Sequence, residues 1–361
     1  MREGWEYICF ESCLNKIPKA KQVKTKEYNS GTKYPIISQE DKLISGYCDD
    51  ESMLFHIDKP VIIFGDHTRV LKYIDFDFVV GADGVKIISP KENLNAKFLL
   101  YFLTWYNIPN LGYSRHYTLL KELDIPVPPL STQLSIVSEL DKISELIRLK
   151  KEQLKDYENL AQSIFYEMFG DPVVNEKGWE VKKLGDVCKF TQGTQVPIEE
   201  QHLSKENGLV QFLRIIDFTQ GKDAPRFVKC SNDKYILHER EIAIVRYGTP
   251  GFVCYGKIGA IANNLFKITP NQKDMFEFEF LVHWLNTEAF QSAVKSKQYG
   301  AALQAIKFST IQGINIIIPS LTVQRSFATR ISQIDKQKQY IESSIKELES
   351  LLASRMQYWF D

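Results

Sequence analysis

The chain has 361 residues, of which 44% are hydrophobic and 25% are charged, and its 45 basic and 45 acidic side chains leave no net charge. This length suits two or more domains, and the composition is typical of a globular protein. Zero net charge argues against a strongly basic DNA-binding chain, so any DNA contact would need local patches or a partner's charge. No apolar run is long enough to span a membrane, and MREGWEYICF contains no signal-peptide core, so we expect a cytoplasmic protein with no membrane contact.

The first 130 residues carry alternating strand and helix signals. Apolar runs bounded by Gly and Asp turns predict strands in PVIIFGDHT (60–68), FDFVVGADGVKIIS (76–89) and LDIPVP (123–128). The segment NAKFLLYFLTWYN (95–107) has the spacing of a helix. Together they predict a compact domain of mixed helix and sheet over residues 1–130.

A long helix is predicted next, over residues 131–170. Two prolines end the preceding strand, and Ser131 or Thr132 can cap the first helical turn. Apolar residues then recur at alternating spacings of four and three, which is a heptad seam interrupted by Lys150. At about 1.5 Å per residue the helix would be roughly 57 Å long, and it cannot bury this seam alone.

The second half follows the same plan. Strand signals recur in EIAIVRYG, GKIGAIANNLFKITP and INIIIPSL, and FEFLVHWLNTEAFQSAV (278–294) reads as one helix. These segments predict a second domain over residues 171–320. A second long helix is predicted over residues 321–361, with a heptad seam interrupted by Lys338 and Arg355.

The two long helices are copies of each other. Residues 131–169 match residues 322–360 without a gap at an offset of 191, after the related starts PPLSTQLS and PSLTVQRS. A looser match, GWE at 4–6 and at 178–180, opens each half. Because neither helix can bury its seam alone, we expect them to pair antiparallel, with a domain at each end and a pseudo-twofold axis.

No catalytic or cofactor motif is visible in the sequence. GFVCYGK (251–257) has the spacing of a phosphate loop, but Ile258 replaces the Ser or Thr that would bind magnesium. The six cysteines and six histidines are dispersed and form no zinc pattern. Catalytic machinery and a cofactor or metal site are therefore not visible in this sequence.

The whole chain resembles the specificity subunits of type I restriction-modification systems. The likeness is carried by residues 125–172 and their copy at 316–361, where an apolar-Pro-x-Leu-x-x-Gln start leads into a long helix. The first copy closes with Phe-Gly-Asp. FGDHTR (64–69), DGVKII (83–88) and GWEVKKLGDVCKFTQGTQ (178–195) are also similar to segments of such subunits.

The resemblance implies both a fold and a function. The fold would be α+β, with two target-recognition domains separated by two long, antiparallel conserved helices that form a coiled-coil pair in a circular repeat. Each domain would read one half of a bipartite, asymmetric site on double-stranded DNA. The chemistry would lie in partners: two modification subunits that bind S-adenosylmethionine and methylate adenine, and restriction subunits that use ATP and magnesium and cleave DNA.

Candidate DNA contacts in the first domain are basic or polar residues on expected loops. Lys and Arg on loops bind phosphates, whereas base edges are read by side chains with fixed donor and acceptor geometry. A solvated lysine loop would have the same composition as a phosphate-binding one. The candidates are Lys16, Lys19, Lys21, Lys24 and Lys26 in a lysine-rich segment, His67, Thr68 and Arg69 after a Gly-Asp turn, and Arg115 and His116 in LGYSRHY.

Candidates in the second domain follow its opening segment and two turns. They are Gln192, Thr194 and Gln195 in TQGTQ, Arg246, Tyr247 and Lys257 around a Gly-Thr-Pro-Gly turn, and Tyr299 and Gln304 around GAA. Arg214 and Asp217 could instead form an internal ion pair.

Two other functions stay open at the level of sequence. One is a stand-alone DNA-modifying enzyme, which would itself bind S-adenosylmethionine or cleave DNA. The other is a coiled-coil adaptor that joins proteins without reading DNA. In a variant of the main interpretation, modification and cleavage share one partner polypeptide.

Overall fold

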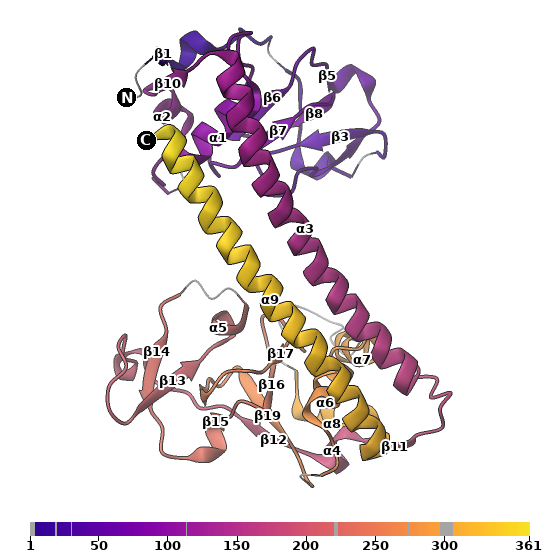
Figure 1. Ribbon diagram of the computed structural model, residues 1–361. Coiled ribbons are helices and arrows are strands. Elements are labelled where there is room, and N and C mark those ends of the chain that lie inside the picture. Colours follow the sequence, from indigo (N-terminus) through magenta and orange to yellow (C-terminus); the bar gives the residue numbers. More distant parts are fainter. Residues whose placement is uncertain are drawn as a thin grey trace. The chain divides into compact units, whose positions relative to one another are not determined.

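The computed structural model describes residues 4–18, 20–29, 31–112, 114–219, 223–272, 274–296 and 306–361. The chain divides into two compact units. Unit 1 comprises Met1–Glu152 with Glu342–Asp361, and unit 2 comprises Gln153–Ile341. Each long helix, drawn in magenta and yellow in Figure 1, therefore contributes one part to each unit; they are α3 (Leu130–Phe169) and α9 (Leu321–Phe360).

In the described part of unit 1, three sheets combine with the short α-helices α1 and α2 and with parts of α3 and α9. Strands β1 (Glu6–Cys9) and β10 (Asp124–Val127) form an antiparallel pair. A second sheet has the order β2-β8-β3-β4 with β5 against β8, and a third has the order β7-β6-β9. The remaining bounds are β2 (Gln22–Val23), β3 (Tyr34–Ile37), β4 (Gly46–Cys48), β5 (Leu54–Phe55), β6 (Val61–Gly65), β7 (Leu71–Ile74), β8 (Phe78–Gly81), β9 (Val85–Ile88), α1 (Ala96–Tyr106) and α2 (Tyr117–Lys121).

Unit 2 has the same kinds of elements. Strands β11 (Glu180–Lys183) and β20 (Asn315–Ile318) form an antiparallel pair. Two four-stranded sheets have the orders β12-β19-β16-β17 and β14-β13-β18-β15. The remaining bounds are β12 (Cys188–Gln192), β13 (Leu209–Leu213), β14 (Arg226–Lys229), β15 (Ile236–Leu237), β16 (Ile242–Val245), β17 (Val253–Cys254), β18 (Gly259–Ile261), β19 (Leu265–Pro270), α4 (Leu184–Val187), α5 (Ile215–Thr219), α6 (Phe278–Leu285), α7 (Glu288–Ser296) and α8 (Phe308–Gln312).

The two units share one strand plan and one register. In unit 1, Ile62 of β6 lies opposite Ile88 of β9, and in unit 2, Ile242 of β16 lies opposite Ile268 of β19. The parallel pairs β3–β8 and β13–β18 correspond in the same way. The sheets differ at one edge, because β9 ends its sheet whereas β19 is covered by an additional strand, β12. The predicted repeat of mixed helix and sheet is confirmed.

Within unit 1, the start of α3 pairs with the end of α9. Nη2 of Arg355 donates to Glu139 Oε2 at 3.2 Å, and the indole N–H of Trp359 donates to the same oxygen at 3.0 Å. Further along, Lys151 lies 2.8 Å from Glu349. The predicted interruption of the seam at Arg355 is thus matched by a carboxylate on the neighbouring helix.

Within unit 2, the end of α3 pairs with the start of α9. Lys338 Nζ lies 3.6 Å from Glu158 Oε1, and Arg330 Nη1 lies 3.8 Å from Glu167 Oε1. In each unit the α9 residue number falls as the α3 residue number rises, so the predicted antiparallel pairing is confirmed. Lys338, the other predicted interruption of this seam, is also matched by a carboxylate.

Two local predictions about helices are wrong. The N-cap is not Ser131 or Thr132, because α3 already begins at Leu130 and the N–H of Thr132 donates to Pro129 O at 2.8 Å. The helix expected over 278–294 is two helices, α6 and α7. The side chain of Asn286 closes the first helix and that of Thr287 opens the second. No helix in the described ranges is long and apolar enough to cross a membrane.

Candidate DNA interface

The loop after β6 is held by its own hydrogen bonds. The main-chain N–H of His67 donates to Gln39 Oε1 at 3.2 Å, and Thr68 Oγ1 donates to Gln39 O at 2.7 Å. Arg69 has a left-handed φ of 62°, and its Nη1 donates to Ile108 O at 2.7 Å. The three candidates therefore share one loop tip, where some of their polar groups fix the loop and Thr68 is exposed.

Arg115 and His116 are neighbours with different environments. Arg115 is exposed, whereas His116 is completely buried. The N–H of Leu111 donates to His116 Nε2 at 3.1 Å, so the ring proton must lie on Nδ1, which donates to Asp66 O at 2.9 Å. The prediction that His116 contacts DNA is not supported, because both ring nitrogens are used inside the protein. His116 instead fixes the loop that presents Arg115.

The lysine-rich segment leaves its described ammonium groups open to solvent. Lys16, Lys21, Lys24 and Lys26 are exposed, and in the described chain none of them forms an ion pair. Lys21 Nζ has one contact, with Ser52 Oγ at 3.4 Å. This arrangement is compatible with phosphate binding and with simple solvation, so the prediction stays open. Three further candidates lie outside the described residues: Lys19, Tyr299 and Gln304.

The TQGTQ segment of unit 2 lies beside the turn that joins β18 to β19. Gln192 Nε2 donates to Asn263 O at 3.0 Å, and Asn263 Nδ2 donates to Gln195 Oε1 at 3.3 Å. Thr194 pairs with Ala262 in a parallel bridge. Gln195 is exposed, whereas Gln192 and Thr194 are half-buried. The structure thus gathers the three candidates around one turn.

Arg246 and Tyr247 follow β16, and Lys257 follows β17. The guanidinium of Arg246 lies 5.8 Å from the Phe308 ring centroid, and its buried Nε has no hydrogen-bond partner among the described residues. Tyr247 is 39% exposed. Lys257 Nζ donates to Asp217 O, so part of its hydrogen-bonding capacity serves the fold. The exposed Tyr247 is the best placed of the three for a ligand.

The expected ion pair between Arg214 and Asp217 is confirmed. Arg214 Nε lies 3.1 Å from Asp217 Oδ2, and the Asp217 side chain is buried. Nη2 of Arg214 also donates to Ala224 O at 3.2 Å. Arg214 therefore stabilises the turn around α5.

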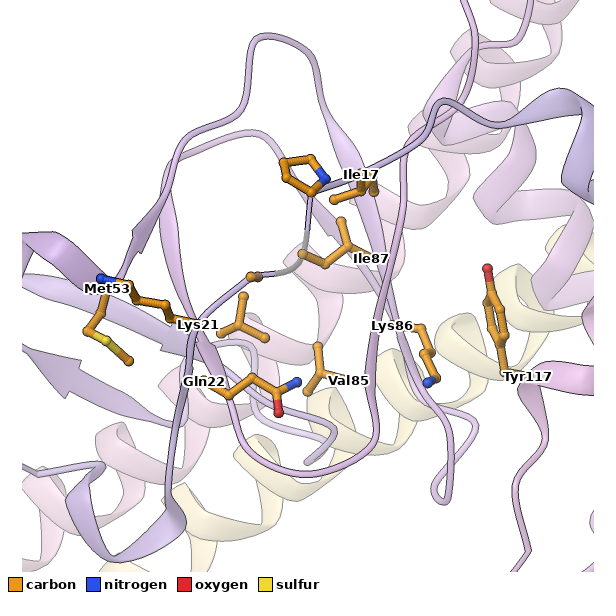
Figure 2. A pocket seen from close by; sticks show the side chains of 11 residues that line it. Ile17, Lys21, Gln22, Met53, Val85, Lys86, Ile87 and Tyr117 are labelled. Carbon is orange, nitrogen blue, oxygen red and sulfur yellow. The ribbon is translucent and has the colours of Figure 1, made fainter.

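A cleft in unit 1 was not predicted from the sequence. Its volume is about 840 Å³, and it lies between the lysine-rich segment and β9 (Figure 2). Four polar side chains contribute to its lining: Lys21, Gln22, Lys86 and Tyr117. Of these only Lys21 was a candidate. The sequence shows Lys86 as a single lysine among the apolar residues of DGVKII. This is weak evidence for a binding residue, because exposed strand positions often carry lysine.

No metal-binding cluster of three His, Cys, Asp or Glu side chains occurs in the described ranges. Most of the candidates that the structure does place are loop side chains carried by a repeated sheet scaffold, and Gln192 is the last residue of β12. Binding residues are commonly found on loops that a rigid scaffold positions.

Comparison with known proteins agrees with this architecture. The profile of the type I restriction modification DNA specificity domain matches residues 2–158 and 176–350. The chain is 26% identical over 287 residues to the type I restriction enzyme MjaIX specificity subunit of Methanocaldococcus jannaschii, covering 70% of this chain and 65% of that protein. It is 23% identical over 379 residues to the EcoR124I/EcoR124II specificity subunit of Escherichia coli, covering 94% of this chain and 88% of that protein.

Solved structures show the same fold. The type I restriction-modification S subunit of M. genitalium matches with a TM-score of 0.56 at 16% identity, over 99% of this chain and 96% of that one. A chain from a study of type I R-M complex assembly and conformational transition matches with a TM-score of 0.53 at 19% identity, over 99% and 98%. Because the family profile covers both halves of the sequence, this chain belongs to the type I restriction-modification DNA specificity family.

Proposed function

We propose that this chain is the non-catalytic DNA-reading subunit of a type I restriction-modification complex in the cytoplasm. The observation that carries the proposal is the repeated scaffold, in which β6–β9 and β16–β19 share one register but carry different loops. One scaffold with two loop sets suits the reading of two different short sequences. The target would therefore be bipartite and asymmetric, with one half read by each unit.

The duplicated helix starts support two equivalent docking positions for a partner. The starts at Leu130 and Leu321 follow equivalent β strands, β10 and β20, in the two units. We infer that two modification subunits dock on the chain and that restriction subunits join the complex. S-adenosylmethionine, ATP and magnesium would be bound by these partners. Partners that bind the DNA backbone would also account for a specificity chain with no net charge.

The test is co-expression of the chain with its modification subunit, followed by mapping of methylated adenines. We expect one bipartite motif. Replacing residues 171–320 with the same region of another family member should change only one half of that motif. A change in both halves would contradict independent reading by the two units.

Two controls separate the other functions. Methylation by the purified chain alone would support a stand-alone enzyme. A complex that assembles but shows no sequence-selective, salt-dependent DNA binding would support an adaptor.

A further inference from the structure

Within the described ranges, strand β9 in unit 1 has no counterpart of the strand that covers β19 in unit 2. In unit 2, β12 pairs with β19 over Cys188–Gln192. In unit 1 the corresponding segment reaches β9 only at its start, where Leu14 bridges Pro90 and Asn15 N donates to Ser89 O at 2.8 Å. Beyond Asn15 the chain leaves the sheet, and the cleft opens between that segment and β9.

On the Lys86 face of the sheet, unit 2 has a cluster of aromatic side chains instead. Phe266 of β19 lies 5.3 Å from Phe308 and 5.9 Å from Phe190, measured between ring centroids. In the shared register Lys86 takes the place of Phe266, and Tyr117, as the first residue of α2, takes the place of Phe308 in α8. The fold therefore does not require an open edge here, since unit 2 covers it with β12 and with aromatic packing on one face.

The cleft offers donors at its rim and aliphatic surface on its floor. Figure 2 shows Lys21 and Gln22 on one side and Lys86 and Tyr117 on the other. Among the lining residues that the structure describes, none is acidic. The nearby carboxylate of Asp66 is buried, and its Oδ2 lies 3.7 Å from Lys86 Nζ. The aliphatic lining includes Ile17, Pro18, Ala20, Val80, Val85 and Ile87.

We propose that this cleft seats one sugar-phosphate strand of the DNA half-site that unit 1 reads; the inference rests on the proposed function. A backbone strand is a convex ridge, and its deoxyribose C–H groups suit an aliphatic floor. Its phosphates suit Lys21 and Lys86 on either rim, with Gln22 and Tyr117 as further donors. Unit 2 covers the corresponding edge with β12, so the two units would hold the DNA backbone differently.

An acidic peptide that adds a strand to the edge of β9 is the competing occupant. A polyanion is favoured over a short peptide because the positive charge continues outside the cleft. Lys16, Lys24 and Lys26 are exposed on the same segment, and in the described structure they have no carboxylate partner. A strand-like peptide confined to the cleft would leave these three charges unused.

The experiment measures DNA binding by the full chain in complex with its modification subunit, over a range of salt concentrations. In Lys21→Ala and Lys86→Ala, the slope of log affinity against log salt should fall by about 1 for each lysine. Affinity should drop roughly 5- to 10-fold on all DNA sequences, and the methylated motif should not change. Lys59→Ala is the matched control, because Lys59 is exposed, pairs with Glu92 at 2.7 Å and does not line the cleft.

Folding and charge are checked separately. Lys86→Ala could leave Asp66 without its cation, so Lys86→Arg, which keeps the charge, should restore the salt slope. Ethylation of phosphates in the half-site read by unit 1 should interfere with binding by the wild-type complex more than by Lys21→Ala.

Three outcomes distinguish the possibilities. Unchanged salt slopes in Lys21→Ala and Lys86→Ala, with normal wild-type binding, overturn the cleft assignment alone. Loss of the modification subunit from these variants points to a peptide of that subunit as the occupant and also overturns the cleft assignment. A wild-type complex that shows no sequence-selective binding refutes the proposed function itself.

Discussion

Gln133 and Gln324 make equivalent hydrogen bonds in the two units. Gln133 is completely buried, and its Nε2 donates to Pro128 O and Asn93 O, each at 2.8 Å. Its Oε1 accepts from the N–H of Asn95 at 2.8 Å. Asn95 is the N-cap of α1, and its side chain accepts two further N–H groups of that helix. One amide thus joins the start of α3 to the start of α1.

Gln324 does the same in unit 2 and is also completely buried. Its Nε2 donates to Pro319 O at 2.8 Å and to Met275 O at 3.2 Å, and its Oε1 accepts from the N–H of Glu277 at 2.9 Å. Glu277 is the N-cap of α6. The glutamine that recurs in both helix starts therefore fastens each long helix to the main helix of its domain.

Replacing either glutamine with alanine should destabilise its own unit. Gln133→Ala leaves one N–H and two carbonyl groups without their partner, the Pro128 carbonyl at a buried position and the Asn93 and Asn95 groups at part-buried ones. Each such group costs about 1 kcal/mol. We expect a loss of about 3 kcal/mol in unit 1 for Gln133→Ala and in unit 2 for Gln324→Ala. Hydrogen exchange resolved by peptide should report the loss in the matching unit.

The control for this pair is Gln337→Ala, since Gln337 is exposed on α9. This variant should leave exchange unchanged in both units. Equal destabilisation by all three substitutions would show that the amide contacts of Gln133 and Gln324 contribute no more to stability than an exposed glutamine does.

The sequence predicted features that depend on periodicity and repetition. The heptad spacing and the copied starts were sufficient for two long helices and their antiparallel pairing. Interruptions at Lys338 and Arg355 were visible as polar letters, but their partners Glu158 and Glu139 lie on the other helix. Such pairings depend on how far one helix is shifted along the other, and the sequence of a single helix does not specify that shift.

Features that depend on tertiary environment were missed. The helix break between α6 and α7 arises from the Asn286 Nδ2 bond to Val282 O and from Thr287 Oγ1, which accepts from the N–H of Phe290 at 3.4 Å. Because Asn and Thr also occur inside helices, the apolar spacing of this segment predicted one continuous helix. His116 was predicted as a ligand contact because a polar residue in a loop is usually exposed, and only packing reveals its burial.

The closing phenylalanine of each long helix should stabilise the unit that it enters. Phe360 packs on Phe98 at 5.5 Å between ring centroids, in unit 1, and Phe169 packs on Phe280 at 4.8 Å, in unit 2. Truncation of a buried phenylalanine costs about 3–5 kcal/mol. Phe360→Ala should therefore lower the free energy of unfolding of unit 1, and Phe169→Ala that of unit 2, in urea titrations followed by exchange. Equal protection of unit 1 in wild type and Phe360→Ala would contradict this assignment.

Substitutions at Arg115 and His116 should separate binding from folding. Arg115→Ala removes an exposed cation, so the affinity of the complex for DNA should fall while the melting temperature stays constant. His116→Ala removes one buried and one part-buried hydrogen bond, so the stability of unit 1 should fall by about 2 kcal/mol. Filter binding and thermal melting on both variants check the pair. A melting temperature lowered equally by both substitutions would show that Arg115 also serves the fold.

His283 should make unit 2 less stable at acidic pH. Burial lowers the pKa of His283 from its ordinary 6.5 to about 4, and the charge of Lys338 acts in the same direction, against the weaker opposing effect of Glu279. The folded chain therefore keeps the ring neutral, while the unfolded chain takes up a proton below pH 6.5. The free energy of unfolding should fall as the pH drops from about 6.5 to 4, by at most about 3 kcal/mol.

His283→Leu removes the titrating ring and keeps apolar contact with Phe327, whose ring centroid lies 5.2 Å from that of His283. Urea unfolding of unit 2 at several pH values should give plots of unfolding free energy against pH that diverge below pH 6.5 between wild type and His283→Leu. Parallel plots would show that other groups cause the acid sensitivity.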